Sequence, residues 1–435
     1  MKKTGDERYE TGDIESDGPS FVGRRLNLLL SFATAIVYFF SNPKPQTYYD
    51  YTFRVAGNLL TGKIAFTERQ PSWLNEFVPF EGVYYSVFPL GAVLSMMPAA
   101  LLKAFGLITE MPGAWISAIL AGLVCYLCLK IAERYDVTTT RRVLMSLGVV
   151  FGTFMWTNLS FAGAWQLALG FAMVGELGAI YFTVYDRRPL LAGLFFALAF
   201  GNRTENLLTA PIFFYLLYKS EPPAVAGGLS GGLKPAKVQP LATASGSDKI
   251  IPLARFCIVP FILGVSTLVY NYVRFHSFTD FGYARIPGVL QEPWYHAGIF
   301  SMQYIPTQAW EMLFKLWNWT SQFPYLKPDG FSASILLSSP FLLFVFRVGA
   351  KRGWLKIAAW LAIVILTFIL WCHGNAGGWQ FAYRYAMVLL PWIFVIMLES
   401  APKKVTLPEW ILYGFAFLAN LYATWLFNWT EYMKV

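Results

Sequence analysis

One acidic residue, Asp50, stands directly after the first long apolar run, between Tyr49 and Tyr51. A carboxylate held between a membrane-spanning helix and a helix on the membrane surface is well placed to act as a general base. Aspartate is also favoured as the cap of a helix start, and this loop by itself leaves both interpretations open.

The residues after Asp50 have the pattern of a short amphipathic helix. Apolar side chains recur at helical spacing from Phe53 to Leu60, while Arg54 and Lys63 lie off that face. Such a pattern predicts a helix lying on the membrane surface. The candidate substrate-binding residues from this region are Tyr49, Arg54 and Lys63.

A second group of polar residues interrupts the apolar stretch 189–218, which has basic residues at both ends. The stretch is expected to form a helical hairpin with its turn at 201–206 (GNRTEN). That turn lies roughly 20 Å from the inner ends, short of the outer membrane surface. Charges at such a depth are costly unless they line a water-filled cavity, so Arg203 and Glu205 are further candidate substrate-binding residues.

A third candidate region is the glycine-rich and aromatic segment 373–391 (HGNAGGWQFAYRYAMVLLP). Its glycines permit a close approach of the backbone to a ligand. Arg384 either extends to lipid headgroups or uses its planar guanidinium to bind phosphate, in which case it could converge with Arg203 on one anion. The candidate substrate-binding residues of this segment are His373, Trp379, Gln380, Tyr383 and Arg384.

The loop 276–330 adds Tyr283 as a candidate substrate-binding residue. A metal site could be assembled from His276, Asp280 and His296, but their spacing matches no standard ligand pattern. We therefore predict no cofactor and no metal.

The composition sets the class of protein. Of the 435 residues, 56% are hydrophobic and 14% are charged, whereas a soluble domain usually carries about 25% charged residues. The net charge of +9 is spread over short clusters between apolar runs. Because no basic arm or recognition helix is present, nucleic acid is excluded as a partner, and the clusters are better explained as topology signals that face anionic lipid.

Several apolar runs are long enough, or nearly so, to cross about 30 Å of hydrocarbon. They are 26–41, 88–107, 113–132, 143–158, 166–185, 189–201, 206–218, 253–275, 331–347, 356–372, 386–399 and 407–426. Arg24 and Arg25 place the N-terminus inside. The later basic loops also fall inside only if 88–107 lies along the outer leaflet, and Pro89 and Pro98 disfavour a continuous helix there.

These patterns predict an all-α polytopic membrane protein with about eleven transmembrane helices and juxtamembrane helices in its first outer loop. A bundle of twelve spans is the alternative. The predicted organisation is a cytoplasmic tail (1–25), a transmembrane module (26–220, with outer loop 42–112), a flexible cytoplasmic linker (221–252) and a second module (253–435, with outer loop 276–330).

Three passages, in order along the chain, resemble a known family. They are YYDYTFRVAGNLLTGKIAF (48–66) with GVYYSVFPLG (82–91), the turn GNRTEN (201–206), and YNYVRFHSFTDFGY (270–283) followed by GGWQFAYRYAMVLLP (377–391). Together they resemble the GT-C superfamily of membrane glycosyltransferases. The likeness is greatest to the bacterial branch related to protein O-mannosyltransferases and aminoarabinose transferases.

The resemblance implies a GT-C-like helical bundle in the bacterial inner membrane that transfers a sugar from a polyprenyl-phosphate or -diphosphate donor. The acceptor hydroxyl, on a glycan, lipid or protein, would lie at the outer face. By resemblance Asp50 is the general base of an inverting reaction, while Arg203 and Arg384 stabilise the departing phosphate. Several relatives carry a second, metal-binding acid in the loop that corresponds to 156–166. This loop has no acid here, and we expect metal-independent transfer.

Two other functions are open from the sequence. A transporter or flippase of lipid-linked sugars would predict inverted repeats and ionisable residues near the middle of the membrane. No internal repeat is visible in the chain, and the charged residues are biased outward. A non-catalytic scaffold would not need acidic and basic residues gathered in loops on one side.

The predicted topology can be tested at Thr138, which lies in the basic loop 133–142. In a variant without the four native cysteines, Thr138→Cys should react with a membrane-impermeant maleimide only after the membrane is opened. Labelling of intact cells would contradict the predicted topology.

Overall fold

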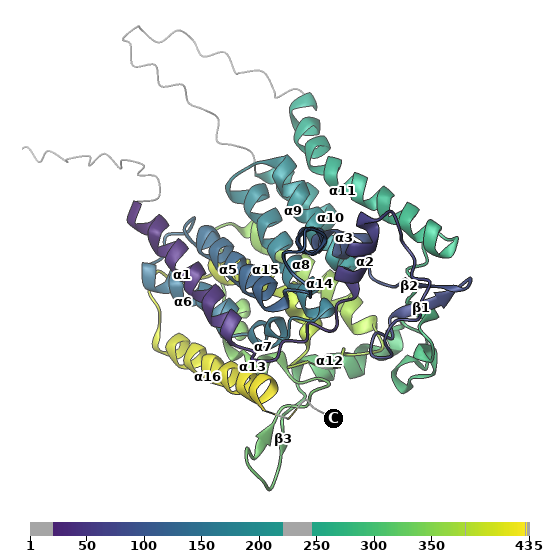
Figure 1. Cartoon of the computed structure of the whole chain (residues 1–435). Helices are drawn as coiled ribbons and strands as arrows, with labels where there is room; N and C mark the ends of the chain where they lie inside the picture. The colour runs from purple at the N-terminus through teal and green to yellow at the C-terminus, as the bar shows by residue number, and fades with distance from the viewer. Residues whose placement is uncertain (1–20, 221–245, 379, 431, 433–435) are drawn as a thin grey trace, which may run out of the picture.

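A computed structural model describes residues 21–220, 246–378, 380–430 and 432. Within these ranges helices dominate (Figure 1), and the strands form two short antiparallel hairpins. Five helices are long and apolar enough to cross a membrane. They are α5 (Gly113–Ala132), α8 (Ala164–Ile180, extended by a π-helical turn to Tyr185), α11 (Gly246–Phe275), α14 (Gly353–Cys372) and α16 (Leu407–Trp429). The chain is therefore a helical membrane protein, and the larger number of spans expected from the sequence stays a prediction.

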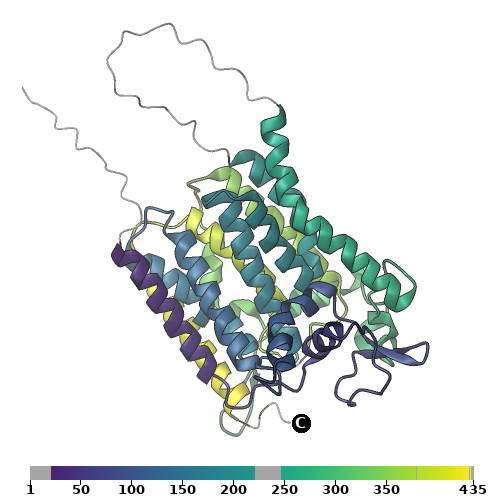
Figure 2. The same cartoon turned by 45° about the horizontal axis from the view of Figure 1, so that its top comes forward.

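Further helices complete the bundle around these five. They are α1 (Phe21–Phe40), α6 (Thr139–Phe151), α7 (Met155–Ser160), α9 (Pro189–Asn202), α10 (Ala210–Lys219) and α15 (Leu390–Glu399). Helix α1 packs against α5, and α9 packs against α8 and α11. Figure 2 shows α1 and α11 running in the same general direction on two sides of the bundle. Most of the predicted linker, 221–245, lies outside the described residues, and α11 begins before the linker was expected to end.

The apolar run 331–347 does not form the single helix that a membrane span would require. It is divided into α13 (Ile335–Ser338) and the 3₁₀ segment Pro340–Phe346, with the non-helical residue Ser339 between them. Proline lacks an N–H group and disfavours helical geometry in the residue before it. Hydrophobicity alone had suggested a span at this position, and Pro340 explains the break.

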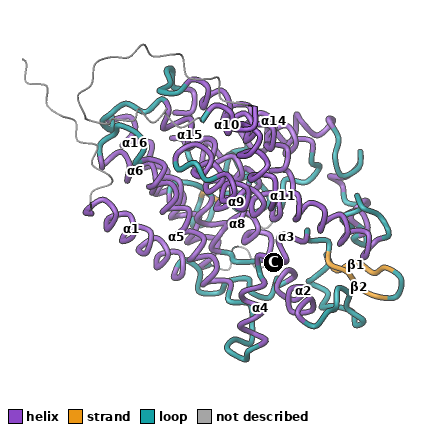
Figure 3. Tube along the Cα trace, turned by 90° about the horizontal axis from the view of Figure 1, so that it is seen from above, coloured by secondary structure: helices purple, strands orange, loops and turns teal. Residues whose placement is uncertain are grey.

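The run 88–107 is interrupted, as its prolines predict. It forms α3 (Leu90–Ser95) and α4 (Met97–Ala104), separated at Met96. Pro89 precedes α3 and Pro98 lies in the first turn of α4, where a missing N–H group is tolerated. Both helices pack with the predicted surface helix α2 (Tyr51–Leu60), as Figure 3 shows at one edge of the bundle.

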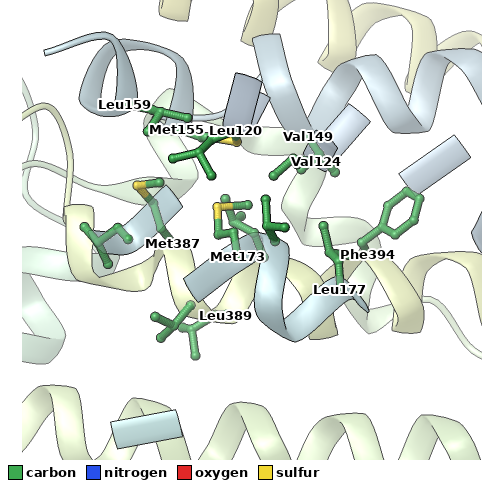
Figure 4. Close-up of a cluster of buried hydrophobic side chains, with 14 of the residues drawn as sticks. Leu120, Val124, Val149, Met155, Leu159, Met173, Leu177, Met387, Leu389 and Phe394 are labelled. Atoms are coloured by element: carbon green, nitrogen blue, oxygen red, sulfur yellow. The ribbon is translucent and has the colours of Figure 1, made fainter. Parts of the chain in front are cut away.

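The apolar core lies between α5, α6, α7, α8 and α15. Figure 4 shows its side chains converging from these helices, among them Leu120, Met155, Met173 and Phe394. Close packing of these side chains holds the helices together, because association of helices within a membrane is driven by van der Waals contact.

The remaining elements are short strands, one short helix and several 3₁₀ segments. One antiparallel hairpin pairs β1 (Phe77–Phe80) with β2 (Val83–Ser86). Helix α12 (Ile305–Leu313) precedes the second hairpin, which pairs β3 (Asn318–Trp319) with β4 (Leu326–Lys327). Short 3₁₀ segments are Thr204–Thr209, Tyr283–Arg285, Val289–Gln291, Pro293–Tyr295, Met302–Tyr304 and Arg384–Leu389.

The close approach of α3 to the end of α9 gives a test of this packing. A Cβ atom added at Gly91 would lie 2.4 Å from the Cα atom of Gly201. Gly91→Ala should therefore separate the two backbones, cost about 1–3 kcal/mol, and lower the melting temperature in detergent by several degrees. Gly57→Ala in α2 is the control, because nothing lies within 4 Å of its added Cβ atom. Equal melting temperatures for the two variants would contradict the packing described.

Candidate functional site

A cavity of about 1160 Å³ lies where three loop regions meet the turn between α9 and α10. Its wall includes Glu76 from loop 42–112, Tyr283 from loop 276–330, and Arg384 from segment 373–391. The turn supplies Arg203 and Glu205. Polar residues far apart in the sequence are thus brought to one partly open cavity of a size suited to a ligand.

Arg203 is held by Glu205 and by an aromatic ring. Its Nε atom donates to Glu205 Oε1 at 2.8 Å, and its guanidinium lies 4.8 Å from the centroid of the Tyr385 ring. The end of α9 is fixed from the side by Asn202, whose Nδ2 atom donates to Ser95 Oγ at 2.8 Å. Helix α3 therefore positions the turn, and the positive charge of Arg203 is balanced within the turn.

Arg384 is buried, with 4% of its surface exposed. Its guanidinium donates to the carbonyl oxygens of Gly378, at 2.9 Å, and Gly377, at 3.2 Å. Both glycines have positive φ angles, which a residue with a side chain rarely adopts. In the described part of the chain, no carboxylate lies within 4.0 Å of this guanidinium and its Nε atom has no hydrogen-bond partner. Arg384 therefore brings to the cavity wall a positive charge that has no described carboxylate in direct contact.

Glu76 is a cavity residue that the sequence interpretation missed. Trp165 Nε1 donates to both of its carboxylate oxygens, at 2.9 and 2.8 Å. Burial raises the pKa of Glu76 to about 7, against the opposing effects of the Trp165 hydrogen bond and the charge of Arg384. Nothing local distinguishes Glu76 from the other acids of its loop, because its partner Trp165 lies 89 residues away in sequence.

Asp50 occupies a different environment. Its Oδ1 atom accepts from Arg54 Nε at 2.6 Å, one turn along α2, and 14% of its side chain is exposed. Its side chain makes no capping hydrogen bond to α2. Burial raises the pKa of Asp50, whereas Arg54 lowers it. Among the described residues that line the cavity, Tyr49 is present but Asp50, Arg54 and the exposed Lys63 are not.

Two residues of segment 373–391 support the cavity wall from behind. Gln380 is fully buried, donates to the carbonyl oxygen of Ala376 at 2.7 Å, and accepts from the backbone N–H of Arg384 at 3.1 Å. Tyr383, also fully buried, donates to Gln308 Oε1 at 2.7 Å. Gln380 thereby fixes the backbone at Arg384, and Tyr383 is anchored to the side chain of Gln308. Trp379 lies outside the described residues.

His373 and Tyr283 form another part of the wall. The Nδ1 atom of His373 is 2.7 Å from the carbonyl oxygen of Asn375, to which it donates, and Nε2 is 3.5 Å from the Tyr295 hydroxyl. The hydroxyl of Tyr283 lies 3.0 Å from the same Tyr295 hydroxyl. Burial lowers the pKa of His373 to about 4, so the imidazole is neutral at physiological pH and can exchange hydrogen bonds with the tyrosines.

The residues considered for a metal site have other partners. His276 contacts Glu81 at 3.1 Å, and Asp280 accepts from Arg285 at 2.7 Å. His296 lies 3.3 Å from the carbonyl oxygen of Pro293. Within the described ranges, no group of three or more His, Cys, Asp or Glu side chains is arranged to hold a metal ion.

Comparisons of this chain with protein-family models, with curated proteins and with solved structures found no match. The resemblance to GT-C enzymes accordingly rests on the three sequence passages.

The lowered pKa of His373 can be measured by NMR, since the chain has only three histidines. With isotopically labelled histidine in detergent micelles, the signal that disappears in His373→Asn should titrate near pH 4. Burial disfavours the charged imidazolium, which is the reason for the low value. A midpoint near the ordinary value of about 6.5 would contradict the buried, neutral state.

Proposed function

We propose that this chain is a membrane glycosyltransferase of the GT-C type, which moves a sugar from a polyprenyl-phosphate or -diphosphate donor to an acceptor hydroxyl. The observation that carries the proposal is the buried guanidinium of Arg384, which reaches a ligand-sized cavity without a carboxylate partner among the described residues. A buried charge of this kind is costly, and an anionic group bound in the cavity would relieve the cost.

A phosphate group suits this position better than a neutral ligand does. Arginine presents several N–H donors in one plane and binds phosphate oxygens in pairs. Arg384 still has an unpartnered Nε atom, and Arg203, whose charge is shared with Glu205, lies on the same wall. Two guanidinium groups near a departing phosphate would stabilise the negative charge that develops on it.

The rest of the wall suits a sugar. Aromatic rings from Trp294, Tyr385 and Phe331 stand beside polar groups such as Asn375 and Asp329. A mixture of aromatic surface and a few oriented polar groups is typical of sites for small polar ligands. We place this site at the outer face, as the charge pattern of the loops predicts, and in a bacterial inner membrane, as the family resemblance implies.

In the proposed reaction a carboxylate of loop 42–112 accepts the proton of the acceptor hydroxyl. The acceptor oxygen forms a bond to the anomeric carbon, while the bond between that carbon and the phosphate oxygen breaks. The phosphate leaves with the bonding electrons, and the configuration at the anomeric carbon is inverted. The family resemblance assigns the role of proton acceptor to Asp50, and Asp50→Asn tests that assignment directly.

The phosphate-binding role of Arg384 predicts a loss of affinity that can be measured without knowing the acceptor. Arg384→Gln should weaken binding of a polyprenyl phosphate to the purified protein about 10- to 100-fold, since hydrogen bonds to charged groups contribute about 1.5–3 kcal/mol each. Arg384→Lys should recover part of the loss, because the charge is kept and the paired geometry is not. Arg69→Gln, an exposed residue of loop 42–112, is the control and should bind normally.

Normal binding by a folded Arg384→Gln protein would remove the main support for the proposal. The unaltered protein could instead bind polyprenyl phosphate, move it from one leaflet of a vesicle membrane to the other, and transfer no sugar. In that case it is a flippase rather than a transferase. Melting temperatures of all three variants would show that each is folded.

A further inference from the structure

Among the described residues, four acids line the cavity, and three of them are engaged by side chains close to them. Glu205 is paired with Arg203, and Asp329 is paired with Lys315 at 3.1 Å. Glu292 accepts from the indole of the neighbouring Trp294 at 2.7 Å. Like Glu292, Glu76 accepts from a neutral indole, but both of its oxygens share that one donor and its charge also interacts with that of Arg384.

The position of Glu76 is well determined. Its carbonyl oxygen accepts from the backbone N–H of Val87 at 3.1 Å, and the next residue begins β1. Trp165, in the first turn of α8, lies with its ring centroid 4.8 Å from that of Tyr49 and 5.3 Å from that of Tyr51. The indole is therefore fixed by aromatic packing, and it fixes the carboxylate in turn.

One indole N–H shared between two carboxylate oxygens leaves most of their lone pairs without a partner. A carboxylate that is held in place but only partly hydrogen-bonded can accept a proton from a ligand in the cavity. Asp50, by contrast, gives an oxygen to the short ion pair with Arg54 and is not among the described lining residues.

We infer that Glu76 is the general base of the proposed transfer and that Trp165 is its positioning residue. This inference rests on the proposed function and names the carboxylate that acts in it. The hydroxyl proton of the acceptor passes to a Glu76 oxygen as the acceptor oxygen attacks the anomeric carbon. The phosphate departs toward Arg384, and Glu76 later returns the proton to water.

The surroundings of Glu76 suit this role. A general base is most effective when its pKa lies near the working pH, and burial raises the pKa of Glu76 to about 7. The charged or titratable groups that interact electrostatically with the Glu76 carboxylate are Arg384, Tyr51 and Tyr283. Burial raises the pKa of both tyrosines, so they are neutral at this pH and Arg384 is the nearby charge.

The test compares Glu76→Gln with Asp50→Asn, and uses Glu81→Gln as a matched control from the same loop with an exposed side chain. Each variant is purified for binding of a polyprenyl phosphate, and is expressed in cells that lack the protein for mass spectrometry of their envelope glycolipids. Glu76→Gln should bind the lipid phosphate normally but lower the rate of product formation about 100-fold or more, the usual contribution of a general base. Glu81→Gln should behave as the unaltered protein does.

The variant Trp165→Phe tests whether Trp165 positions the Glu76 carboxylate or only supports the fold. The indole hydrogen bond lowers the pKa of Glu76, so its removal should raise that pKa. Since the base must be deprotonated, the rise of activity with pH should then move to higher pH. An infrared titration should show the same shift in a carboxylic-acid band that is absent from Glu76→Gln.

Normal product formation by Glu76→Gln, with Asp50→Asn inactive, would overturn the inference and leave the proposed function standing. A Trp165→Phe protein with an unchanged pH profile would overturn the positioning role. If the unaltered protein neither binds polyprenyl phosphate nor changes the glycolipids of the cells, the proposed function is wrong and the inference falls with it.

Discussion

The arrangement of the cavity depends on how a buried guanidinium is accommodated. A charge taken out of water costs several kcal/mol unless hydrogen bonds and opposite charges replace its hydration. For Arg384 that replacement comes mainly from the carbonyl oxygens of Gly377 and Gly378, which can face the guanidinium because both glycines adopt positive φ angles. Gln380 holds the same backbone from behind. The carbonyl groups satisfy hydrogen bonds without neutralising the charge, and the cavity retains a positive wall.

The position of the turn that carries Arg203 depends on close packing of two backbones. Helix α3 can touch the end of α9 because Gly91 and Gly201 have no side chains between them. This contact, together with the bond from Asn202 to Ser95, places Arg203 and Glu205 at the cavity. The interrupted segment 88–107 thus supports a polar turn from the side, a role that one continuous span would not provide.

The first loop shows how tertiary contacts separate two carboxylates of similar chemistry. Asp50 is close to Arg54 because residues four apart share one face of a helix. Glu76 has no such local partner and is held instead by Trp165 at the start of α8. The first carboxylate is engaged by its own helix, whereas the second is presented to the cavity, and this difference decides which of them can meet a ligand.

The sequence by itself determined the features that follow from local chemistry. Composition identified a membrane protein, proline positions predicted the break in 88–107, and the polar turn at 201–206 indicated a cavity, because charge in hydrocarbon needs water or a partner. Five candidate ligand-binding residues, chosen from three separate segments of the sequence, line one cavity: Arg203, Glu205, Tyr283, His373 and Arg384.

Only the tertiary structure decided which polar groups face that cavity. Glu76 could not be distinguished in the sequence, since its environment is made by Trp165 and Arg384 from distant segments. Nor could the sequence show that Gln380 would bond to the backbone of Arg384 and Tyr383 to the side chain of Gln308, both away from the cavity. Helix periodicity and turn chemistry depend on neighbours in the chain, whereas burial, pKa and exposure to a ligand depend on residues that meet only when the helices pack.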